Sequence, residues 1–130
     1  IQSYNELIPW YITLCVEDIE KSRTFYDELL KVIDYKIVLG KDDKPFCRYG
    51  IDIDPIFGIV QEDSSNPANS HVHIAFKVES KELVKELYDK ALVLGEKDNG
   101  PPGTRPHYVD SYYDAFILDL DGNNMKVCLY

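Results

Sequence analysis

The sequence predicts an α+β domain that consists of two tandem copies of one β-α-β-β-β unit. Three observations support this prediction: a long internal repeat, a stripe of apolar residues at helical spacing in each copy, and strand-like segments before and after each stripe. A chain of 130 residues with a hydrophobic share of 45% fits a single closed domain. We therefore expect one domain over residues 1–130, with module one at about 8–61, a linker at 62–70 and module two at about 71–130.

The repeat aligns residues 12–30 with residues 74–92 without a gap, a shift of 62 positions. The apolar pattern matches almost throughout. The identities include Ile12 with Ile74, Glu17 with Glu79, Glu20 with Glu82, Tyr26 with Tyr88, Asp27 with Asp89, and Leu30 with Leu92. Agreement in register over a strand and the helix after it favours duplication over chance.

The first copy begins with a predicted strand at residues 10–16, which is short and rich in β-branched and aromatic residues. Asp18 is a suitable N-cap for a following helix, and Glu20 lies in its positive first turn. The apolar stripe of that helix is Ser22, Phe25, Tyr26, Leu29, Leu30 and Ile33. Three further strands are expected at 35–39, 45–49 and 56–61.

The second copy repeats this order, with a predicted strand at residues 71–78 and Ser80 as the N-cap. Gly95 supplies the left-handed residue that ends the helix. The stripe of this helix is Leu83, Val84, Leu87, Tyr88, Ala91 and Leu92. Strands are expected at 93–97, 113–118 and 124–129.

Two connections in the second copy carry turn signals. The tetrapeptide at 119–122 contains Asp-Gly between apolar runs, which predicts a hairpin. Residues 98–110, which contain the run Gly-Pro-Pro-Gly, are interpreted as a long loop of the kind that shapes a binding site.

The net charge of -9 excludes some partners. An acidic surface repels phosphate backbones and anionic lipids, so we expect neither nucleic acid nor a membrane as partner. No apolar run in the sequence is long enough to span a bilayer, and we expect no export signal, because no basic segment followed by an apolar run is present at the start. The cysteines Cys15, Cys47 and Cys128 are interpreted as buried free thiols, which suggests a cytoplasmic protein.

Five segments match a known family pattern: residues 12–26, 73–76, 103–108, 112–116 and 119–124. They resemble the glyoxalase/bleomycin-resistance/extradiol-dioxygenase (vicinal oxygen chelate) superfamily, and above all its glyoxalase-like subgroup. The resemblance implies a curved, cup-like mixed sheet with helices outside and a pocket for a small organic molecule. In the metal enzymes of this family, two His and two carboxylates typically bind a divalent metal in the pocket, where the metal acts as a Lewis acid.

The resemblance assigns four positions to those ligands, and only His73 carries a suitable side chain. Tyr11 lies at the other His position, Lys126 lies at a carboxylate position, and the fourth position falls near Gly58. A neutral phenol is a poor ligand and an ammonium cannot ligate. We therefore expect no metal cofactor. A rearranged site that uses His71, His107 or a carboxylate stays open.

If the family fold is correct, Tyr11, His73 and Lys126 converge in the pocket. They could bind an anionic or carbonyl-bearing molecule, or act as acid–base catalysts, since His titrates near neutral pH. Further candidates for ligand binding are Arg105, His107, Tyr112 and Tyr113.

The favoured function is a metal-free protein that binds a small organic molecule, with a degenerate metal site. The alternative is an enzyme: a metal-dependent glyoxalase-type lyase or isomerase, a ring-cleaving dioxygenase, or an acid–base catalyst. A structural or interaction protein is a third hypothesis. The sequence leaves open whether the chain forms a homodimer.

Overall fold

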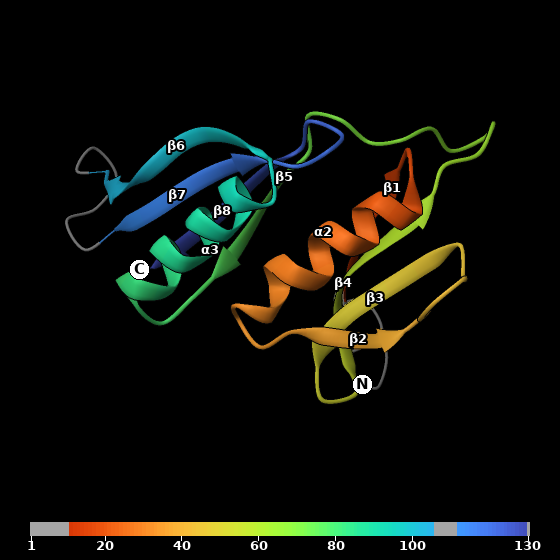
Figure 1. Cartoon of the computed structure of the whole chain (residues 1–130), viewed down its shortest axis with the longest axis horizontal. Helices are drawn as coiled ribbons and strands as arrows, with labels where there is room; N and C mark the ends of the chain where they lie inside the picture. Colours follow the sequence, from red (N-terminus) through yellow and green to blue (C-terminus); the bar gives the residue numbers. More distant parts are fainter. Residues whose placement is uncertain (1–10, 106–111, 130) are drawn as a thin grey trace, which may run out of the picture.

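The computed structural model describes residues 11–105 and 112–129. It confirms the α+β class, with two four-stranded mixed sheets and one helix on each (Figure 1). The strand order of the first sheet is β1 (Ile12–Val16), β4 (Asp54–Gln61), β3 (Phe46–Ile51) and β2 (Lys36–Leu39). The second sheet has the matching order β5 (His73–Lys77), β8 (Asn124–Leu129), β7 (Tyr113–Leu118) and β6 (Lys97–Thr104). In each sheet the first pair of strands is parallel and the other two pairs are antiparallel.

The strand register confirms the duplication at the level of single residues. Gly58 lies between Thr13 and Arg48 in the first sheet. Lys126 lies between Ala75 and Phe116 in the second. Because the repeat places Thr13 on Ala75, Gly58 is the structural counterpart of Lys126, as the sequence predicted. By the same register, Arg48 is the counterpart of Phe116.

The helices α2 (Ile19–Lys31) and α3 (Lys81–Val93) begin at the predicted caps. The Asp18 carboxylate accepts hydrogen bonds from the amides of the first turn of α2, and Ser80 accepts one from the Leu83 amide. Gly95 has φ +93°, which fits its predicted role after α3. Most of both predicted stripes is buried. Ile33 and Leu83 are half-buried, and Leu92, near the end of α3, is 39% exposed.

The structure corrects the prediction for residues 93–110. Helix α3 extends through Val93, so the next strand, β6, begins only at Lys97 and continues to Thr104. The Gly-Pro-Pro-Gly run is therefore part of a strand. An edge strand tolerates proline because the ladder requires its amides on one side only. The pairing of β6 with β7 also shifts register twice, between Asp98 and Gly103. The last part of the predicted loop, residues 106–110, lies outside the described residues.

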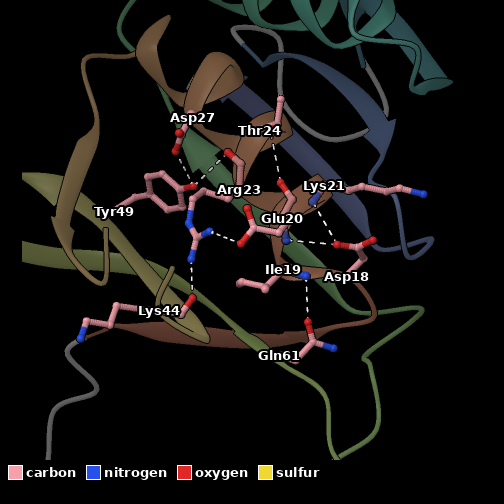
Figure 2. A network of polar contacts seen from close by, with 10 residues as sticks. All are labelled: Asp18, Ile19, Glu20, Lys21, Arg23, Thr24, Asp27, Lys44, Tyr49 and Gln61. Atoms are coloured by element: carbon pink, nitrogen blue, oxygen red, sulfur yellow. Dashed lines mark hydrogen bonds and ion pairs between the residues drawn. The ribbon is translucent and has the colours of Figure 1, made fainter. Parts of the chain in front are cut away.

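Helix α2 is held on the first sheet by a partly buried polar network (Figure 2). The Tyr49 hydroxyl donates to Asp27 Oδ1 at 2.7 Å, and the Arg23 guanidinium contacts Glu20 at 3.0 Å and donates to the Lys44 carbonyl. Burial raises the pKa of the Tyr49 phenol, so the hydroxyl stays protonated and remains a donor. This network has a structural role.

The two modules share one core. Phe76 of β5 packs edge-on against Phe57 of β4 at 5.6 Å between ring centroids and against Tyr35 at 6.0 Å. A buried polar contact also joins them, because the Tyr26 hydroxyl of α2 donates to Asp119 Oδ2 at 2.6 Å. Each helix covers one face of its own sheet, and within residues 11–105 and 112–129 no helix lies on the opposite face, which we call the helix-free face (Figure 1). No helix in the described ranges has the length and apolarity to cross a bilayer.

Candidate functional site

The helix-free face of the second sheet carries most of the predicted site residues. On β5, Ile74 and Phe76 are buried in the core, while His73, the first residue of the strand, is exposed. On β8, Lys126 lies between the buried residues Met125 and Val127. Since side chains alternate along a strand, His73 and Lys126 lie on the face opposite α3.

Phe116 is the centre of a cluster on that face. The Lys126 ammonium lies 4.5 Å from the centroid of the Tyr112 ring and 5.8 Å from that of Phe116. The His73 ring packs edge-on against Phe116, with 6.0 Å between centroids. A cation above the face of an aromatic ring is attracted by the ring quadrupole. The structure therefore brings the predicted residues His73, Lys126 and Tyr112 together around a ring that the prediction did not include.

Arg105 lies at the end of β6 beside this cluster. Its Cζ is 5.8 Å from the Phe116 ring centroid, and its Nε is 3.2 Å from Asp114 Oδ1. Asp114 is fully buried, so the ion pair is shielded from water on the carboxylate side. The charge of Arg105 is therefore largely balanced within the protein.

The remaining predicted residues lie elsewhere. Tyr113 is on the opposite face of β7 from Phe116, packs in the core, and has the Lys81 ammonium 5.2 Å from its ring centroid. Tyr11 directly precedes β1 of the first sheet, and its ring centroid lies 4.8 Å from Cζ of Arg48. His107 lies outside the described residues.

Arg48 is a residue that sequence reasoning missed. It lies on β3 between the buried residues Cys47 and Tyr49, so it belongs to the helix-free face of the first sheet. The sequence does show a charged residue between two apolar positions of a predicted strand. Its contact with Tyr11 could not be predicted, because it depends on how the strands pair.

The four positions assigned to metal ligands do not fit a divalent ion. The register confirms that Gly58 and Lys126 occupy equivalent places, and neither offers a ligating atom on its side chain. His71 is exposed and has φ +71°, and it precedes β5, so it does not form a regular strand pair of ligands with His73. Among the described residues there is no group of three or more His, Cys, Asp or Glu side chains that could hold a metal.

The comparison with protein families matches residues 9–127 to the Glyoxalase/Bleomycin resistance protein/Dioxygenase superfamily. The chain belongs to this superfamily. Its repeated β-α-β-β-β modules agree with that assignment. The comparison with curated proteins gave no match.

Several solved structures show the same fold. A glyoxalase/bleomycin resistance protein from Albidiferax ferrireducens T118 is 27% identical, with a TM-score of 0.78 over 92% of this chain and 97% of that one. Hypothetical protein SA1046 from S. aureus is 22% identical, with a TM-score of 0.73 and full coverage of both chains. A fosfomycin resistance protein from Listeria monocytogenes, complexed with Mn(II) and 1S,2S-dihydroxypropylphosphonic acid, is 21% identical, with a TM-score of 0.66 over 93% of this chain and 88% of that one.

Proposed function

We propose that this member of the superfamily binds a small organic anion on the helix-free face of its second sheet, without a metal ion. The observation that carries the proposal is the position of Lys126, whose ammonium lies against Tyr112 and Phe116 at the register position assigned to a metal ligand. An ammonium there repels a divalent cation and attracts the anionic group that a metal would otherwise hold.

The surrounding side chains suit such a ligand. His73 offers an imidazole donor or acceptor beside the same ring, and the partly exposed Phe116 offers apolar area for a carbon skeleton. The protein as a whole carries a net charge of -9, so a local cationic site is needed to attract an anion. The fosfomycin resistance relative was solved with a phosphonic acid, which is a small organic anion, although that complex also holds Mn(II).

The enzymatic alternative predicts a different behaviour. A metal-dependent lyase, isomerase or dioxygenase would need a bound divalent ion, and an acid–base enzyme would need turnover without one. Tyr11 stays a predicted acid–base partner of His73 and Lys126, and its ring contacts the Arg48 guanidinium. We favour binding without catalysis, because it requires only the Lys126 ammonium and the rings that it contacts.

The test combines calorimetric titration with thermal unfolding. A panel of small carboxylates and phosphonates is titrated into the wild-type protein, Lys126→Gln and His73→Gln, with Lys85→Gln on the exposed side of α3 as a charge-matched control. We expect at least one saturating ligand, about tenfold weaker for Lys126→Gln and unchanged for Lys85→Gln, since one lost charged contact is worth about 1.5 kcal/mol.

Thermal unfolding with and without Mn²⁺, Zn²⁺ and Ni²⁺ provides the second measurement. A ligand that binds only the folded state raises the unfolding temperature, so an unchanged transition is expected with each ion. A large rise with one ion, or turnover of a 2-oxoaldehyde–thiol adduct or a catechol, would overturn the proposal in favour of the enzyme.

A further inference from the structure

A second cation lies on aromatic rings on the helix-free face of the first sheet. The Cζ atom of Arg48 is 4.8 Å from the centroid of the Tyr11 ring and 5.6 Å from that of Phe46. Tyr11 precedes β1, whereas Phe46 and Arg48 lie on β3. The two rings hold the guanidinium through contacts that use its face and leave its N–H groups available.

The glycine on the intervening strand allows this arrangement. Strand β4 lies between β1 and β3, and Gly58 pairs with Thr13 on one side and Arg48 on the other. A Cβ atom at Gly58 would lie 3.3 Å from Cγ of Arg48 and 3.2 Å from Oγ1 of Thr13. Without a side chain at position 58, the stem of Arg48 can cross β4 towards the Tyr11 ring.

Arg48 differs from the other two arginines in its electrostatic environment. Arg23 forms an ion pair with Glu20 at 3.0 Å, and Arg105 forms one with Asp114 at 3.2 Å. Within the described part of the chain, no carboxylate lies within ion-pair distance of Arg48, although the sequence contains 23 acidic residues. A guanidinium that is held by rings and has no ion-pair partner among the described residues is suited to an external anion.

We propose that Arg48 forms a second anion-binding site, which takes the carboxylate group of a small organic acid. The planar guanidinium matches the two oxygens of a carboxylate in a two-pronged contact, and the fixed rings reduce the entropy that this contact costs. This site uses strands of the first sheet, whereas the Lys126 cluster uses strands of the second. The two sites can therefore be tested independently.

The three arginines allow a direct test, because each contributes one side-chain Nε–Hε signal in a ¹H–¹⁵N NMR spectrum. Sodium benzoate is the carboxylate probe, and inorganic phosphate is the comparison anion. With benzoate we expect a saturating shift of the Arg48 signal and almost none for Arg23. The response should persist in Lys126→Gln, which separates this site from the one on the second sheet.

Two variants test the contact itself. Arg48→Lys keeps the charge but loses the two-pronged geometry, so the affinity for benzoate should fall about tenfold. Arg48→Gln should abolish the saturable response while the backbone spectrum shows that the protein is folded. The proposal is overturned if the Arg48 signal does not saturate by about 50 mM benzoate, a concentration far above the Kd of a usable site. It is also overturned if Arg48→Lys binds benzoate as wild type does, or if phosphate is bound more tightly than benzoate.

Discussion

Removal of one hydroxyl group at the junction of the modules should have a large effect on stability. The Tyr26 hydroxyl donates to Asp119 Oδ2 at 2.6 Å, and the two residues are only 1% and 4% exposed. Burial, together with the charge of Asp119, raises the pKa of Tyr26 well above its usual value, so the phenol remains a donor. In Tyr26→Phe the ring packing is kept and only this hydrogen bond is lost.

The magnitude follows from the charge and burial of the acceptor. Asp119 keeps hydrogen bonds from the amides of Asp121 and Asn123 and from the Asn123 side chain. Loss of one hydrogen bond to a buried charged group costs about 1.5–3 kcal/mol, so we expect a loss of about 2 kcal/mol. For a domain of this size that corresponds to a decrease of about 8 °C in Tm.

The duplication provides a matched control. Tyr88 is the repeat counterpart of Tyr26, and its hydroxyl donates at 2.9 Å to Asp98, which is exposed and belongs to the same module. Tyr88→Phe should therefore cost only about 0.5–1 kcal/mol, the usual range for an accessible hydrogen bond. Urea unfolding of both variants at pH 7 measures the difference. Equal losses, or a loss below about 0.5 kcal/mol for Tyr26→Phe, would refute a junction role for this contact.

Three further outcomes are expected. Burial, followed by the charge of Asp119, raises the pKa of Asp121 in the folded protein. The ionised carboxylate therefore destabilises the fold above that folded-state pKa. This destabilisation is lost as the pH falls below 3.8, the pKa of an unperturbed Asp. Asp121→Asn should therefore have a higher Tm than wild type at pH 7 and a similar Tm near pH 4, and a lower Tm at pH 7 would contradict this reasoning. Cys47 is fully buried, and burial raises the pKa of its thiol, whereas Cys15 is partly exposed. A thiol reagent should therefore label Cys15 much faster than Cys47 under native conditions, and equal labelling rates would count against the described packing. Gly58→Val should weaken benzoate binding by displacing the stem of Arg48, measured by the same NMR titration, and unchanged binding would show that the crossing over β4 is not required.

The repeat and both helices could be predicted because their signals are local. Apolar spacing of three and four residues, together with Asp18 and Ser80 as caps, determines where α2 and α3 begin. The equivalence of Gly58 and Lys126 also followed from the sequence, since two modules with the same fold must share one register. The same comparison showed that the four positions assigned to metal ligands lack a suitable set of donors.

Strand β6 and the partners of the site residues depended on contacts between distant segments. The Gly-Pro-Pro-Gly run has the composition of a loop, yet β7 supplies a ladder that an edge strand can join through one side alone. Likewise, Arg48 meets Tyr11, and Lys126 meets Tyr112 and Phe116, because neighbouring strands place them on a shared face. The sequence by itself determined the modules and the residue types at their equivalent positions. Only the tertiary structure decided which cation lies on which ring, because cross-strand distances arise from sheet pairing and not from order along the chain.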